Sequence, residues 1–244
     1  MKKIFVLVGS RRKQGNTIKF VKSIIQELDK NKFEIEYAFP QDYNISHCVG
    51  CHSCFINNRC ISDDDTEILQ KKVLASDLLI IASPVYLHYF TADLKLFMDK
   101  ASWWTHTLRL QGKPVVILST CGSNGFNTVI KPLGEIMAYM GGNVIATANA
   151  AAYPNQINNL EWLKDVSSKI AQRIKKYIKM PPKSNIDIEK IFPITKACVM
   201  QQADVNGMDD VKFCEYEYWK KTGMIEYDSF GQYLKIKYDG GEYS

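Results

Sequence analysis

The chain has 244 residues, of which 46% are hydrophobic, and it carries a formal net charge of +5 at pH 7. This length and composition predict one well-buried core of moderate size with an appendage. No apolar run approaches the roughly 18 residues that a membrane helix requires, so we expect no membrane segment and a cytoplasmic protein. The positive charge fits phosphate-bearing ligands. Nucleic acid is not an expected partner, because the basic residues are scattered along predicted helices and no recognised binding motif accompanies them.

The first predicted elements are a strand at 3–9, a glycine-rich turn and a helix at 16–30. The turn reads Gly9-Ser10-Arg11-Arg12-Lys13-Gln14-Gly15-Asn16-Thr17. A tight turn into a helix start leaves backbone N–H groups unpaired at the positive end of the helix dipole. Hydroxyls, an amide and cations surround these groups, so we expect a phosphate site. Asn16 stands where a triphosphate-binding loop has its lysine, which favours a single terminal monophosphate.

This turn resembles the G-S-P-R-K-x-G-N-T loop of the flavodoxin-like, NADPH-dependent FMN reductases, a family with an iron-sulfur flavoprotein branch. The resemblance implies a three-layer α/β sandwich whose turn binds the phosphate of FMN. It assigns the following residues to the cofactor: Ser10, Arg12, Gly15, Asn16 and Thr17. Arg11 replaces the proline usual in that loop, so we expect a looser turn and an added cation.

Strands and helices keep alternating up to residue 180. We predict further strands at 33–39, 77–83, 113–119 and 143–148, and further helices at 65–75, 91–105, 126–140 and 158–179. Such alternation predicts a parallel sheet with helices on both faces. Five strands fit the flavodoxin order 2-1-3-4-5, in which the ligand lies over the loops after strands 1, 3 and 4. We therefore place an FMN-binding domain at residues 1–180.

The loops after the third and fourth strands supply the other candidate flavin contacts. In the first loop a proline stiffens the exit from the strand, and the backbone amides and aromatic side chain that follow can border a flat ring. The second loop is small and rich in glycine, which permits close approach of the backbone to a ligand. The resemblance assigns both loops to the flavin ring through Pro84, Val85, Tyr86, Leu87, Thr120, Cys121, Gly122 and Gly125.

Seven cysteines are present. Four of them form a C-x2-C-x2-C-x5-C array between the second strand and the second helix: Cys48, Cys51, Cys54 and Cys60. The spacing suits a [4Fe-4S] cluster and resembles the motif of iron-sulfur flavoproteins. The acidic run at 63–65 equally resembles clusterless relatives with structural or redox thiols, and two nearby histidines keep zinc open. The sequence leaves these three alternatives open.

Aromatic residues outside these loops are assigned mainly to packing. Trp103 and Trp104 fit either the cap of a substrate pocket or a dimer interface. Beyond residue 180 we predict helices at 186–203 and 209–222, the second with an aromatic stripe typical of packing. The last twenty residues fit a hairpin or an arm over a neighbouring subunit. We therefore define residues 181–244 as a helical extension for packing or oligomerisation.

Together these features predict an FMN-dependent oxidoreductase that takes hydride from NAD(P)H and passes electrons to a quinone, a nitro compound or another small acceptor. No side chain is assigned as catalytic, because the flavin carries the chemistry. An alternative is an iron-sulfur flavoprotein that carries electrons between partner proteins, and a second is a redox- or metal-sensing module built on the cysteines. The cysteine loop follows an edge strand, so electron transfer from a cluster would cross a subunit interface, which favours a homodimer or homotetramer.

Overall fold

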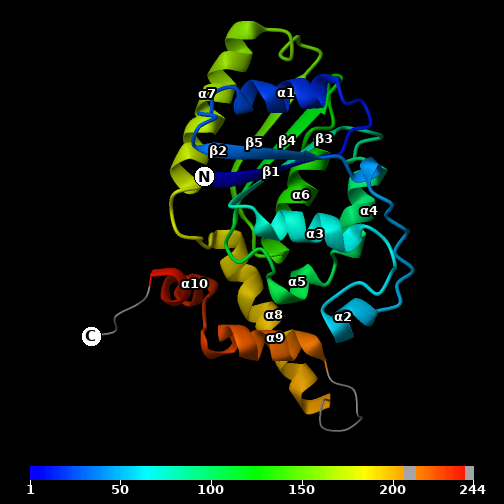
Figure 1. Cartoon of the computed structure of the whole chain (residues 1–244), viewed down its shortest axis with the longest axis vertical. Coiled ribbons are helices and arrows are strands. Elements are labelled where there is room, and N and C mark those ends of the chain that lie inside the picture. Colours follow the sequence, from blue (N-terminus) through cyan, green and yellow to red (C-terminus); the bar gives the residue numbers. More distant parts are fainter. Residues whose placement is uncertain (206–212, 240–244) are drawn as a thin grey trace.

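The computed structural model describes residues 1–205 and 213–239, and its first 180 residues form a three-layer α/β sandwich (Figure 1). The strands are β1 (Lys2–Val8), β2 (Phe33–Ala38), β3 (Leu78–Pro84), β4 (Pro114–Cys121) and β5 (Asn143–Ala151). All pair in parallel, in the order β2-β1-β3-β4-β5. The flavodoxin-like arrangement predicted from the sequence is therefore confirmed.

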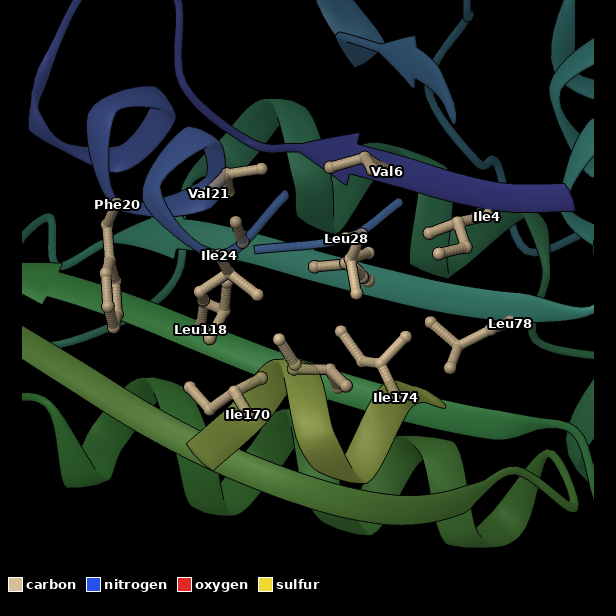
Figure 2. Packing of buried hydrophobic residues seen from close by; sticks show 14 of the residues in the cluster. Ile4, Val6, Phe20, Val21, Ile24, Leu28, Leu78, Leu118, Ile170 and Ile174 are labelled. Atoms are coloured by element: carbon tan, nitrogen blue, oxygen red, sulfur yellow. The ribbon is translucent and has the colours of Figure 1, made fainter. Parts of the chain in front are cut away.

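Two layers of helices bury the sheet. One face is covered by α1 (Asn16–Ile25) and α7 (Leu160–Tyr177), and the other by α3 (Thr66–Ala75), α4 (Ala92–Lys100) and α6 (Asn127–Tyr139). Side chains of β1 alternate between the two faces: Ile4 and Val6 join the α1 and α7 cluster, whereas Phe5 packs on the other side. Figure 2 shows the first cluster, in which Ile170 and Ile174 of α7 lie below the side chains of α1 on the same face of the sheet.

The predicted helix at 91–105 is broken in the structure. It ends at Lys100, and a separate short helix, α5 (Trp104–Thr107), follows after a turn. The break carries Trp103 and Trp104 into the core, where their indole rings meet edge to face at 6.2 Å and are only 3% and 1% exposed. Both expectations for these tryptophans, a substrate cap and a dimer interface, are therefore wrong for this chain, because the rings are covered from within.

The extension forms its own cluster of buried side chains beside α6. The extension consists of α8 (Ile186–Val205), α9 (Cys214–Thr222), a 3-10 turn η2 (Met224–Glu226) and α10 (Phe230–Asp239). The predicted helix at 209–222 begins at Cys214, and residues 209–212 lie outside the described part of the chain. Even α8, with 20 residues, lacks the apolar character needed to cross a membrane, as do the other described helices.

The last predicted segment is helical. We expected a hairpin or an arm, but residues 230–239 form α10, and residues 240–244 lie outside the description. Phe230, Tyr233 and Leu234 recur at helical spacing and pack with Phe192 and Trp219 of the extension. The extension thereby completes a core within the same chain, on the side of the molecule where α5 and α6 lie (Figure 1).

Trp219 tests how firmly the extension is joined to the sandwich. Its indole is fully buried, stacks on Phe192 at 5.2 Å, and donates from Nε1 to the carbonyl oxygen of His106 at 2.7 Å. We expect Trp219→Ala to lower the free energy of unfolding by about 3–5 kcal/mol, and Trp219→Phe, which keeps the ring, to lower it by about 1–2 kcal/mol. Urea unfolding followed by circular dichroism measures both. A wild-type midpoint for Trp219→Ala would show that the sandwich does not depend on this contact.

Candidate functional site

A cavity of about 180 Å³ lies at the carboxyl ends of β1, β3 and β4, where the strand order reverses. Parallel strands all end at this edge, so loops that are distant in the sequence meet here. The lining residues are Ser10, Arg12, Gly15, Asn16, Thr17, Pro84, Val85, Tyr86, Thr120, Cys121, Gly122 and Ala152. The structure therefore brings together the predicted flavin residues except Leu87 and Gly125, and adds Ala152.

The turn after β1 is shaped by a close approach to α4. The Gly9 carbonyl oxygen accepts a hydrogen bond from Thr91 Oγ1 at 2.7 Å. A Cβ at Gly9 would lie 2.8 Å from that hydroxyl and 2.9 Å from Leu94 Cβ, so a side chain does not fit. Within the turn, the Gly15 N–H bonds the Arg12 carbonyl at 2.9 Å and directs the chain into α1.

The start of α1 presents unpaired donors to the cavity. Among the described residues, the backbone N–H groups of Ser10, Asn16 and Thr17 have no hydrogen-bond acceptor, and no side chain caps the helix. The first turn of α1 also contains no acidic residue. Free N–H groups at the positive end of a helix dipole are suited to binding an anion, and the sequence predicts a phosphate at this turn.

The three cations of the turn have different surroundings. Arg11 makes a bidentate ion pair with Asp93 of α4, at 2.8 and 2.7 Å, and Lys13 pairs with Asp42 at 2.6 Å. Arg12 has no acidic partner in the part of the chain that the structure describes. The cation that Arg11 adds to the turn is therefore paired with α4. Arg12 is the cation of the turn that remains for a bound anion.

Hydroxyl and backbone contacts hold the three loops around the cavity together. Thr17 Oγ1 lies 2.7 Å from Thr120 Oγ1, both buried, which joins the start of α1 to the end of β4. The Val85 N–H donates to the Thr120 carbonyl at 2.8 Å, which joins the loops after β3 and β4. Gly125 packs behind them: a Cβ there would lie 2.8 Å from Val85 Cγ1. Gly125 thus supports the loop after β3 from outside the cavity.

Residues 86–89 form a tight hairpin at the rim of the cavity. Tyr86 and Tyr89 exchange backbone hydrogen bonds of 2.9 and 3.0 Å, and the two turn residues, Leu87 and His88, have positive φ values of 45° and 56°. Both central residues of such a turn need left-handed backbone, which glycine or asparagine usually supplies. Leu87 is 98% exposed at the tip, so its side chain points away from the cavity that the sequence assigned to it.

The end of β5 brings residues close to the cavity that the sequence did not single out. Asn149 donates from Nδ2 to Cys121 Sγ at 3.4 Å, and its buried Oδ1 has no partner among the described residues. Ala152 follows directly after β5, which extends three residues beyond the strand predicted at 143–148. The sequence signal that could have indicated this contribution is the run of small residues at the end of the strand, because small side chains let the backbone border a ligand.

The cysteine loop is closed at its base by the acidic run. Asp64 Oδ2 accepts from Ser46 N and Oγ at 3.0 and 2.6 Å, and Asp65 Oδ2 accepts from the Asn44 N–H at 2.8 Å. Lys100 Nζ lies 3.0 Å from Asp64, and both side chains are almost fully buried. Burial alone raises the pKa of Asp64, but hydrogen bonds from Ser46, Thr66 and Lys100 lower it well below its ordinary range. These residues therefore have a structural role.

The four cysteines of the loop differ in exposure and surroundings. Cys48 and Cys51 are exposed, whereas Cys54, in the short helix α2 (Ser53–Asn57), and Cys60 are half-buried. Cys60 Sγ instead lies 3.6 Å from Lys100 Nζ. No group of three or more histidine, cysteine, aspartate or glutamate side chains in residues 1–205 and 213–239 is placed to hold a metal ion. The arrangement fits free thiols and does not fit a preformed [4Fe-4S] or zinc site.

The thiol state of this loop is directly measurable. We expect the protein to titrate as seven thiols after denaturation without reductant, and to contain no stoichiometric iron or zinc when purified anaerobically. As a control, Cys198→Ser removes an exposed cysteine outside the loop and should lower the count by one. About four irons per chain, lost together in Cys48→Ser, would contradict this expectation and show that the loop rearranges around a cluster.

Comparison with known proteins identifies the family. Residues 2–155 match the model of the NADPH-dependent FMN reductase family. An iron-sulfur flavoprotein of Archaeoglobus fulgidus is 30% identical over 229 residues, covering 90% of this chain and 98% of that protein. The structure of RosB with bound 8-demethyl-8-formylriboflavin-5'-phosphate has a TM-score of 0.59 at 18% identity, covering 86% of this chain and 89% of RosB. An NADH:FMN oxidoreductase in its apo form has a TM-score of 0.52 at 18% identity, covering 77% of this chain and 96% of that protein. Sequence and fold together place the chain in the NADPH-dependent FMN reductase family.

Proposed function

We propose that this protein is an FMN-dependent oxidoreductase that takes hydride from NAD(P)H and passes electrons to a quinone, a nitro compound or another small acceptor. The observation that carries this proposal is the Arg12 guanidinium, which lies beside the open start of α1 and has no acidic partner within residues 1–205 and 213–239. One cation together with free backbone N–H groups matches a single terminal phosphate. Membership of the family supports flavin oxidoreductase chemistry in general.

The residues present fit FMN. Ser10, Arg12, Asn16 and Thr17 would hold its phosphate, and the segments 84–86 and 120–122 would border its ring. At about 180 Å³ the cavity is smaller than the roughly 300–1,000 Å³ of complete ligand pockets, so the ring would extend across its rim. When bound, FMN supplies the hydride acceptor and passes electrons onward, while the chain binds and orients it.

The hairpin at 86–89 supports a site for a second flat molecule. The side chains of Tyr86 and Tyr89 remain 53% and 40% exposed at the rim of the cavity. Exposed aromatic rings offer stacking surface to a nicotinamide or an aromatic acceptor that approaches the flavin in turn. This arrangement suits an enzyme with successive flat substrates better than it suits a carrier.

We also propose that the protein assembles as a homodimer or homotetramer. A hollow of about 610 Å³ between α6 and α8 is bordered by Tyr139 and Ile186, which are 41% and 71% exposed. Exposed apolar residues that gather beside a hollow are typical of interaction surfaces. Self-association would cover these side chains from water.

The test of the proposed function is anaerobic reduction. The purified protein should release FMN on heating, and its bound flavin should lose its visible absorbance within seconds of adding NADH or NADPH and regain it with a quinone. Release of FAD would contradict the choice of cofactor. Flavin that neither nucleotide reduces, but that dithionite reduces in two separate one-electron steps, would instead establish the electron-carrier alternative.

Arg12 provides the sharpest test of the phosphate site. Loss of a charge-assisted contact removes on the order of 1.5–3 kcal/mol, so Arg12→Ala should raise the Kd for FMN roughly ten- to a hundredfold. Lys13→Ala removes a neighbouring cation that already pairs with Asp42, and it should change the Kd by less than about fivefold. Fluorescence titration of both variants measures this. Equal losses of FMN affinity in the two variants would show that the turn acts only through its net charge.

A further inference from the structure

A second polar cavity, of about 290 Å³, lies at the amino ends of β1, β3 and β4, at the opposite edge of the sheet from the flavin site. We call it the junction cavity, because the sandwich and the extension both contribute to its walls. The sandwich contributes the starts of these strands, the end of α3 and the loop before β4, and the extension contributes Pro182 and Tyr238 of α10. Nothing in the proposed flavin chemistry uses this cavity.

The junction cavity has more positive than negative charge. Lys2, Arg109 and Lys113 line it, and Asp77 is the one acidic lining residue in the described part of the chain. Lys2 Nζ pairs with Asp77 at 2.8 Å, whereas neither Arg109 nor Lys113 forms an ion pair with any described carboxylate. The lining side chains therefore carry a net charge of about +2 at neutral pH. Because Asp77 is paired with Lys2, Arg109 and Lys113 face the same small cavity with no ion-pair partner of their own among the described residues.

Lys113 is a poorly compensated ammonium. It donates to the carbonyl oxygens of Leu74, at 3.3 Å, and Ser76, which satisfies hydrogen bonds at the end of α3 but supplies no full negative charge. Burial lowers the pKa of Lys113 from its ordinary value to about 8, and the nearby Asp77 carboxylate offsets only part of this shift. A cation in such surroundings is destabilised unless an anion accompanies it. A bound anion would restore the charged form.

Arg109 presents a guanidinium that aromatic rings hold in place. Its Cζ lies 5.1 Å from the Trp103 ring and 4.7 Å from the ring of Tyr218 on α9, within the range of cation–π contacts. Aromatic contacts fix the plane of the group without neutralising its charge. A planar, permanently charged guanidinium is suited to an oxyanion, which can accept two parallel hydrogen bonds from it.

The loop that carries both cations has an uncommon backbone. Leu108, Gln111 and Gly112 have positive φ values of 40°, 49° and 75°, and a Cβ at Gly112 would lie 2.6 Å from Leu234 Cδ1 of α10. Gln111, which lines the cavity, is held through its Oε1 by Tyr233 and Lys237 of α10. Left-handed conformations of non-glycine residues persist where the surroundings enforce them, often at functional sites. Here the extension holds the loop in place.

We propose that the junction cavity binds a phosphate group, either as inorganic phosphate or as part of a small phosphate monoester, through Arg109 and Lys113. Phosphate carries between one and two negative charges at neutral pH, which matches the excess positive charge of the lining better than a monocarboxylate does. Because the walls come from both parts of the chain, a bound phosphate would also join the extension to the sandwich.

The test is calorimetric titration of the full chain saturated with FMN, so that the flavin phosphate site is filled. Inorganic phosphate is one probe and glycerol phosphate the other, each against chloride at equal ionic strength. We expect saturable binding of at least one probe, and a roughly tenfold or greater loss of affinity in Lys113→Gln. Saturation by both probes identifies free phosphate as a sufficient ligand, and saturation by glycerol phosphate alone identifies a monoester.

Lys179→Gln is the matched control, because Lys179 is an exposed lysine between the lining residues Ile178 and Met180. It removes the same charge and should leave the affinity unchanged. The proposal is overturned if neither probe binds, if Lys113→Gln binds like the wild type, or if Lys179→Gln weakens binding equally.

A second measurement removes dependence on the folding of Lys113→Gln, which loses contacts at the end of α3. In the wild-type protein, acetylation of Lys113 at pH 8 should slow by roughly tenfold when phosphate is present, because the anion restores the unreactive ammonium. Lys179 serves as the internal reference and should react at an unchanged rate. Equal rates at Lys113 with and without phosphate would also overturn the proposal.

Discussion

The close contact between Gly9 and α4 determines how the rest of the proposed flavin site is built. The Thr91 hydroxyl donates to the Gly9 carbonyl and accepts from the Leu94 N–H to begin α4, and the Thr91 N–H donates to Ser83 Oγ of β3. One threonine therefore fixes the end of β1, the end of β3 and the start of a helix relative to one another. The anion-binding turn follows directly from this junction, so its N–H groups are held by rigid elements and not by a free loop.

Much of this arrangement could be predicted from the sequence. Apolar runs of five residues predict strands that are buried on both faces, and β1 is such a strand. The small residues around Gly9 and Gly15 predict a turn in which the backbone itself binds the ligand, and the structure leaves its donors free. These signals are local: each depends on a few adjacent residues and on the ends of parallel strands meeting at one edge, which topology guarantees.

The features that were missed depend on contacts between distant parts of the chain. Arg11 was read as a free cation because Asp93, its partner, is 82 residues away. Leu87 was assigned to the flavin ring through the resemblance of its loop to that of the family, whereas a two-residue turn rotates its side chain outward. The helical spacing of Phe230 and Tyr233 was visible, but the hydrophobic partners that stabilise α10 come from α8 and α9. The local sequence pattern alone does not reveal which distant surface a segment packs against.

The way in which the cysteine loop is attached has a consequence for how such proteins diversify. Its two ends meet at Asn44, Ser46, Asp64 and Asp65, next to the buried Lys100, so the chain leaves the body and returns at nearly the same point. Between these two anchored ends, the loop contacts α5 through the stacked rings of Phe55 and His106, and it contacts the extension through α2 against α9. A segment anchored at both ends in this way can be replaced as a unit. Its length and cysteine content can change among relatives, or in an engineered variant, while the strands that carry the proposed flavin site keep their register.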